Sequence, residues 1–187
     1  MEIILARHGE PALRQRSWIA PLQLAHWIHA YNDAGIVVED PPLKVSAKAA
    51  ESRFIVSSPL PRCLDSAQAV APGREIFRED TVREAGLPYS SWVFPRLPLT
   101  VWTALFRLGW FCGYSSNSES FAAARDRTRT AVARLIEFSR EHQSVFVMGH
   151  GIMNALVARD LLRQGWIGPK RAKHGYWQFS VYRKGAP

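Results

Sequence analysis

The sequence predicts an α/β protein in which a mostly parallel sheet lies between two layers of helices, a three-layer sandwich. Short apolar runs typical of buried strands alternate with longer stretches whose apolar residues recur at helical spacing. Two of the apolar runs end in polar tripeptides, at residues 7–9 and 149–151. Ligand sites of parallel α/β sheets lie beyond the carboxyl ends of the strands, so these tripeptides mark a candidate site.

The first half of the chain contains three expected strands and two expected helices. The apolar run at 2–6 predicts a first strand, and 21–34 predicts a helix between Pro21 and Gly35. The remaining elements expected here are a strand at 53–57, a helix at 63–70 and a short strand at 75–77.

The second half repeats the pattern. Residues 118–142 predict a long helix with Ser118 as a candidate cap, and 145–148 predict a fourth buried strand. A helix at 152–164 and a final edge strand at 177–182 complete the expected order.

Residues 92–114 depart from this rhythm because they are mostly apolar and aromatic. Trp102, Phe106 and Trp110 fall on one helical stripe, which predicts a helix packed through its aromatic face. A lid over a site, membrane-surface docking and a partner surface remain alternatives. Arg107 lies within the stretch and argues against a transmembrane span. We therefore expect one domain, residues 1–187, with an aromatic-rich insert at about 90–117.

Composition restricts the possible classes of protein. The chain has 187 residues, of which 47% are hydrophobic and 21% charged, which excludes a disordered or fibrous protein. It has two cysteines, Cys63 and Cys112, and an acidic residue at position 2, where a signal peptide needs cations. These features predict a cytoplasmic location.

The charge balance points to an anionic partner. The formal net charge is +8, and arginines outnumber lysines by 19 to five. The cations are spread along the chain without a block, so we expect a phosphorylated small molecule and no nucleic acid. His26 and His29 are spaced for a shared helix face, but no third ligand accompanies them, and we expect no metal site.

Cations and histidines gather at the expected strand ends: Arg7, His8, Arg62 and His150. Neutral imidazole is nucleophilic near pH 7, and guanidinium groups suit planar recognition of phosphate oxygens. This combination favours phosphoryl chemistry, although single His-Gly pairs are weak evidence.

Four segments in order resemble the motifs of a known family. Arg7-His8-Gly9-Glu10 resembles the N-terminal signature of the histidine phosphatase, or phosphoglycerate mutase-like, superfamily. Residues 57–67 are similar to its second strand-to-helix element, 83–86 to its acidic segment, and 148–151 to its second histidine motif. The resemblance extends from Met1 to about Gly165, and it implies a phosphoglycerate mutase-like fold.

The resemblance also implies roles for individual residues. His8 would be the nucleophile that forms a phosphohistidine, and Glu84 would donate the proton to the leaving oxygen. Arg7, Arg62 and His150 would bind the phosphoryl group, with His150 also counted as catalytic. No metal ion and no cofactor are implied.

The sequence departs from the family at two positions. Arg14 stands where many members have a phosphate-binding asparagine, so we count it as a further candidate phosphate ligand. Pro11 occupies a place often filled by Ser or Thr. The chain is also shorter than typical phosphoglycerate mutases, which favours a phosphatase acting on a small-molecule phosphate. A mutase, a protein-phosphohistidine phosphatase and a phosphate-binding module without turnover remain alternatives, and a homodimer is possible.

Overall fold

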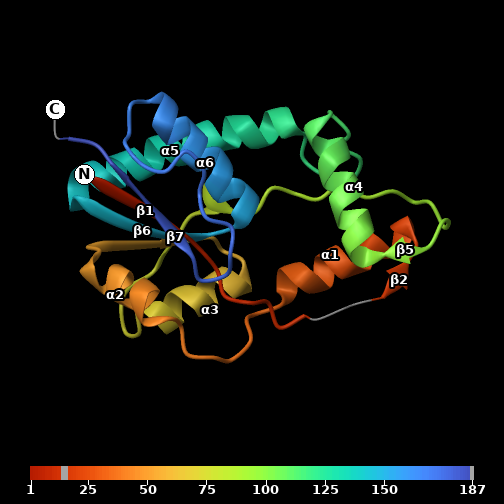
Figure 1. Cartoon of the computed structure of the whole chain (residues 1–187), viewed down its shortest axis with the longest axis horizontal. Coiled ribbons are helices and arrows are strands. Elements are labelled where there is room, and N and C mark those ends of the chain that lie inside the picture. The colour runs from red at the N-terminus through yellow and green to blue at the C-terminus, as the bar shows by residue number, and fades with distance from the viewer. Residues whose placement is uncertain (14–16, 186–187) are drawn as a thin grey trace.

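Five strands form one mixed sheet in the order β4–β3–β6–β1–β7 in the computed structural model, which describes residues 1–13 and 17–185 (Figure 1). The strands are β1 (Glu2–Arg7), β3 (Phe54–Ser57), β4 (Phe77–Arg78), β6 (Ser144–Gly149) and β7 (Phe179–Arg183). The first four run parallel, and β7 pairs antiparallel with β1 at the edge. Arg7 is the register partner of Gly149, so the segments that follow β1 and β6 emerge side by side.

Helices cover both faces of the sheet (Figure 1). They are α2 (Leu43–Glu51) and α3 (Pro61–Val70) on one face, and α5 (Phe121–His142) and α6 (Gly151–Arg163) on the other. Because successive side chains of a strand point to opposite faces, Ile3 and Leu5 pack with α5 and α6, whereas Ile4 and Ala6 pack with α2 and α3. This confirms the expected α/β architecture.

A third group of elements lies beside the sheet. It consists of β2 (Trp18–Ile19), the 3₁₀ turn Pro21–Gln23, α1 (Leu24–Asp33), β5 (Leu97–Pro98) and α4 (Leu99–Phe111). Trp102, Phe106 and Trp110 on α4 are all buried, and the Trp102 indole donates a hydrogen bond of 2.8 Å to the Ile19 carbonyl. The aromatic stripe therefore packs inward, and the idea that these three side chains form a membrane or partner surface is wrong.

Several boundaries differ from the sequence expectations. The long helix begins at Phe121 because Ser120, not Ser118, accepts a hydrogen bond of 3.1 Å from the Ala123 amide and caps it. Helix α2 was not expected at all. A 3₁₀ turn, η2 (Asp80–Val82), follows the short strand β4. Among the described residues, no helix is both long and apolar enough to cross a bilayer.

Candidate active site

His8 follows β1 directly and is buried at the carboxyl edge of the sheet. Its Nδ1 lies 2.7 Å from the carbonyl oxygen of Gly9, which can only accept a hydrogen bond. Nδ1 is therefore the protonated nitrogen of the neutral ring, and Nε2 carries the free lone pair. The ring of His150 lies edge-on to that of His8, with 5.2 Å between their centroids.

Burial keeps both imidazoles uncharged at neutral pH. Desolvation lowers the pKa of His8 to about 3, the hydrogen bond to Gly9 opposes this shift, and the charges of Arg62 and Arg7 reinforce it. Desolvation also lowers the pKa of His150 well below its usual value, with Arg62 as the next contributor. A neutral imidazole is the nucleophilic form, so His8 is in the state that attack on phosphorus requires.

Two guanidinium groups place positive charge beside the histidines. Arg62, in the first turn of α3, is 1% exposed and lies over the ring of Tyr31 at 4.5 Å. Arg7 lies over the ring of Tyr176 at 4.3 Å and donates a hydrogen bond to the carbonyl of His174. In both arginines Nε is buried and has no hydrogen-bond partner among the described residues. Unsatisfied buried donors of this kind fit an anion.

His150 is the N-cap residue of α6 and contacts one side chain from the β3–α3 connection, Ser58, and one from α3, Cys63. Its Nε2 lies 2.8 Å from Oγ of Ser58 and 3.3 Å from Sγ of Cys63. Desolvation raises the pKa of the Cys63 thiol far above its usual value, so this cysteine is a packing neighbour and not a reactive thiolate. Ser58 thus orients the imidazole through a hydroxyl.

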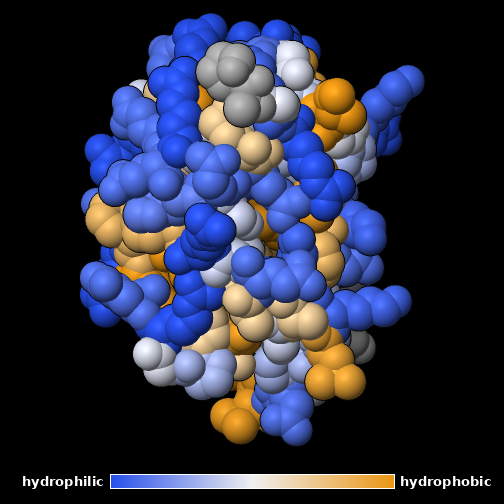
Figure 2. Space-filling model, turned by 90° about the vertical axis from the view of Figure 1, so that its left-hand side faces the viewer, coloured by the Kyte–Doolittle hydropathy of each residue, from blue (hydrophilic) through white to orange (hydrophobic). Residues whose placement is uncertain are grey.

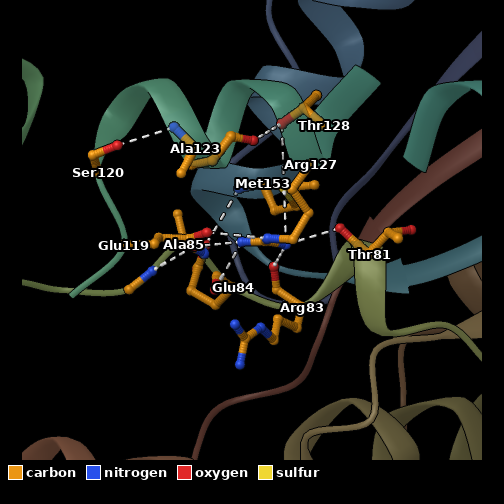
Figure 3. A network of polar contacts seen from close by, with 12 residues as sticks. Thr81, Arg83, Glu84, Ala85, Glu119, Ser120, Ala123, Arg127, Thr128 and Met153 are labelled. Carbon is orange, nitrogen blue, oxygen red and sulfur yellow. Dashed lines mark hydrogen bonds and ion pairs between the residues drawn. The ribbon is translucent and has the colours of Figure 1, made fainter. Parts of the chain in front are cut away.

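Glu84 lies on the loop that follows η2. Its Oε1 accepts hydrogen bonds from the amide of Ala85 at 3.0 Å and from the amide of Met153 at 3.3 Å, in the first turn of α6 (Figure 3). The carboxyl group is thereby tied to α6, whose N-cap residue is His150. The loop and α6 together bring the expected proton donor to the same edge of the sheet as the histidines.

Arg127 of α5 holds the loop that carries Glu84 (Figure 3). Its Nη1 donates to the carbonyls of Thr81 and Arg83 at 2.8 and 2.9 Å, and its Nη2 lies 2.5 Å from Oε1 of Glu119. Burial opposes ionisation of Glu119, but the hydrogen bonds and charge of Arg127 outweigh it and hold the pKa of that carboxyl below its usual value. Sequence reasoning did not identify this clamp.

A cleft of about 620 Å³ opens beside these groups. Residues of α1, the loop after η2 and α4 line it, together with Arg62 of α3, and Glu84 is among the lining residues of the loop. The lining combines aromatic and aliphatic side chains, such as Trp27, Tyr31 and Leu87, with charged ones, such as Arg107 and Glu119. The cleft has the size and lining of a small-molecule site.

The structure brings His8, His150, Arg7 and Arg62 together and places Glu84 at the adjoining cleft. Arg14 lies outside the described residues. No cluster of three or more potential ligands is placed to hold a metal in the described part of the chain. Gly9 has a packing reason of its own, because a β-carbon there would collide with the indole of Trp177.

The chain matches the sequence model of the histidine phosphatase superfamily (branch 1) over residues 43–184. It belongs to that superfamily. No curated protein matches it significantly. The expected family is confirmed, and with it the expectation of a histidine phosphatase-type enzyme.

Solved structures share the superfamily fold with this chain. The mycobacterial glucosyl-3-phosphoglycerate phosphatase matches with a TM-score of 0.57 and 22% identity, over 87% of this chain and 79% of that one. A structure described as a putative α-ribazole-5′-P phosphatase from Escherichia coli matches with a TM-score of 0.62 and 17% identity, over 97% and 89% of the two chains. A mycobacterial hydrolase matches with a TM-score of 0.63 and 20% identity, over 96% and 87%.

Proposed function

We propose that this protein hydrolyses phosphate monoesters of small molecules through a covalent phosphohistidine on His8. The observation that carries the proposal is the pair of neutral imidazoles, 5.2 Å apart, beside two guanidinium groups with unpartnered Nε atoms. Phosphoryl transfer needs a nucleophile and preorganised positive charge around the phosphoryl oxygens, and these side chains supply both.

In the first step Nε2 of His8 attacks phosphorus in line with the ester oxygen. A P–N bond forms, the P–O bond to the alcohol breaks, and Glu84 gives its proton to the departing oxygen. Arg7, Arg62 and His150 donate hydrogen bonds to the three equatorial oxygens. Because Gly9 accepts from Nδ1, the developing positive charge on the imidazole is stabilised by a backbone carbonyl.

In the second step a water molecule attacks the phosphohistidine. Glu84, now a carboxylate, accepts a proton from the water, the P–N bond breaks, and inorganic phosphate and neutral His8 result. The protein's own cations provide the positive charge at each step, so the mechanism requires no metal ion.

The cleft supports a bulky, amphipathic alcohol as the leaving group. Trp27 and Tyr31 are stacked, with 4.8 Å between ring centroids, and offer an aromatic wall for a ring. Trp27 Nε1 and Ser118 Oγ are buried without hydrogen-bond partners among the described residues, and both residues line the cleft. A hydroxylated ring system would pack on this wall and satisfy such donors. Two similar structures are named for glucosyl-3-phosphoglycerate and α-ribazole-5′-P, which are phosphates of this general kind.

We further infer that residues 1–187 act as one domain in which residues 90–117 are an insert that shapes the cleft. Helix α4 lies in that insert, and its residues Thr103, Ala104 and Arg107 line the cleft.

The first test is hydrolysis of p-nitrophenyl phosphate in EDTA by the native chain and by His8→Ala. We expect turnover in the native chain and none in the variant, and rapid quenching into alkali should trap a phosphoryl group on the native chain alone. Turnover in His8→Ala would show that another residue is the nucleophile. Absence of turnover in both, even with alkyl phosphates, would contradict the hydrolase.

Glu84→Gln tests the proton donor by comparing two leaving groups. The p-nitrophenolate ion leaves without protonation, whereas an alkoxide needs a proton. We expect kcat/KM, which reports the steps up to formation of the phosphohistidine and not its hydrolysis, to fall by about 10²–10⁴-fold for an aliphatic phosphate ester and much less for p-nitrophenyl phosphate. Equal losses for the two substrates would contradict a role in protonating the leaving oxygen.

A further inference from the structure

Large apolar side chains are exposed at the end of the molecule that carries β2 and β5. We call Trp18, Leu22, Trp92, Val93 and Phe94 the apolar tip; their exposed fractions are 67%, 44%, 58%, 72% and 78%. They come from two segments that contact each other, since the Leu22 amide donates to the Trp92 carbonyl at 3.0 Å and β2 pairs with β5. Clusters of exposed aromatic residues of this size mark an interaction surface.

The outer side of α4 extends the apolar surface from the tip. Val101, Leu105 and Leu108 follow helical spacing and are 38%, 49% and 63% exposed, while Trp102 and Phe106 are buried on the inner side. A helix that is apolar on both sides packs against something on each of them. In the described chain the inner side is covered and the outer side is not.

The charge of the segments that build this end identifies the chemistry of the partner. Residues 17–32 and 85–118 contain no aspartate or glutamate, although the chain has 16, and their two arginines are at positions 96 and 107. Arg96 is exposed and follows the apolar tip by two residues. The opposite end of the molecule, which faces the viewer in Figure 2, is mainly hydrophilic. Arg107 lines the cleft and donates hydrogen bonds to the Gly86 and Ala85 carbonyls. Arg96 is therefore the exposed cation that the described residues of these segments place beside the apolar tip, and no acidic side chain accompanies it in them.

We propose that the apolar tip and the outer side of α4 dock the protein onto an anionic membrane surface. Tryptophan and phenylalanine suit the boundary between headgroups and acyl chains, and the exposed Arg96 suits anionic headgroups. A second copy of this chain would bring the same acid-free cationic surface against itself, without complementary charge. A lipid surface complements both the apolar residues and the cations.

Docking in this way brings the cleft close to the bilayer. Thr103, Ala104 and Arg107 line the cleft from α4, so the cleft lies against the same helix whose Val101 and Leu105 would face lipid. An α-helix with its side chains is about 10–12 Å across, which sets the scale of the separation between cleft and lipid. The proposal does not depend on the hydrolase activity, and either one can fail alone.

Co-sedimentation with vesicles tests the proposal. The full chain is mixed with vesicles of phosphatidylcholine alone or of phosphatidylcholine and phosphatidylglycerol at 7:3, at low and high salt. We expect binding to the anionic vesicles, little binding to phosphatidylcholine, and weakening by salt. The double variant Trp92→Ser/Phe94→Ser should lower the bound fraction at least fivefold.

A matched control is Val38→Ser/Ile167→Ser, because Val38 and Ile167 are equally or more exposed but lie outside the two acid-free segments. It should bind like the native chain, and urea unfolding should show that both double variants are folded. Equal losses in the two double variants, or no binding to anionic vesicles, would overturn the proposal. A dimer in sedimentation velocity that dissociates in Trp92→Ser/Phe94→Ser, without vesicle binding, would instead assign the surface to a second copy.

Discussion

Two arginines on α5 each lie 2.5 Å from a carboxylate oxygen, but one of these pairs is mostly buried and the other is exposed. Arg127 pairs with Glu119, and their side chains are 16% and 18% exposed. Arg129 pairs with Asp126, and their side chains are 63% and 69% exposed. Replacing each arginine by methionine therefore compares a mostly buried ion pair with an exposed one. The N–O distance is the same in both pairs, and both arginines lie on α5.

The buried pair should contribute far more to stability. Arg127→Met leaves the partly desolvated Glu119 carboxylate without its partner and removes the hydrogen bonds to the Thr81 and Arg83 carbonyls. Loss of one partner of a fully buried pair costs about 3–5 kcal/mol, and because these two side chains keep some exposure, that range is the upper limit for Arg127→Met. The exposed pair is screened by water, so Arg129→Met should cost less than about 1 kcal/mol.

The assay is urea unfolding of the native chain and the two variants. We expect Arg127→Met to lower the unfolding midpoint strongly, with the slope unchanged. The double variant Arg127→Met/Glu119→Gln should recover part of the loss, because the uncompensated charge is removed. Equal free-energy losses for Arg127→Met and Arg129→Met would refute the reasoning that burial decides the strength of these pairs.

The same substitution tests a positioning role. Arg127 donates hydrogen bonds to the carbonyls of Thr81 and Arg83 and lies 3.5 Å from the Glu84 carbonyl. Its loss should therefore displace the Glu84 carboxyl group. At a temperature where the variant is folded, kcat/KM should fall more for an aliphatic phosphate ester than for p-nitrophenyl phosphate. A merely structural role would lower both rates equally.

Three further outcomes are expected. Burial lowers the pKa of His8 to about 3, whereas a free histidine titrates near 6.5, so the unfolded chain binds protons first as the pH falls. This group should lower the unfolding free energy by about 2 kcal/mol between pH 7 and 5, and His8→Asn should lack that loss in urea titrations. Gly9→Ala should cost about 1–3 kcal/mol in the same assay, because the new methyl group meets the Trp177 indole; an unchanged midpoint would contradict this packing. Ser58→Ala removes the hydroxyl 2.8 Å from His150, and kcat should fall about tenfold; an unchanged kcat would exclude this contact from catalysis.

Much of the fold could be predicted because its strands are buried on both faces. Such strands are continuous apolar runs, as at 3–6 and 145–148, and glycine and proline mark their ends. Helix α2 was not predicted because its buried apolar side is made by Val45 and Ala49, and small residues give a weak periodic pattern of hydrophobicity. Strand β4 has two residues, and its pairing with β3, not its own pattern, defines it.

The polar residues of the candidate site could be predicted from the sequence, whereas the residues that surround them could not. His8, Arg62, Glu84 and His150 each follow a recognisable local pattern. The aromatic residues over the two arginines, Tyr31 and Tyr176, come from elements distant in the sequence and have no motif of their own. The same holds for Arg127, which is more than 40 residues away in the sequence from the Thr81 and Arg83 carbonyls that it binds.

The order of apolar runs and polar strand ends by itself determined the architecture, the family resemblance and the candidate nucleophile, because these depend on local patterns in the chain. The tertiary structure alone decided that the aromatic stripe of α4 packs inward while Leu105 and Leu108 face outward. It also decided that desolvation, reinforced by the charges of Arg62 and Arg7, lowers the pKa values of His8 and His150 and keeps both rings neutral. Burial and electrostatic environment arise from contacts between distant segments, and a linear sequence does not encode them position by position.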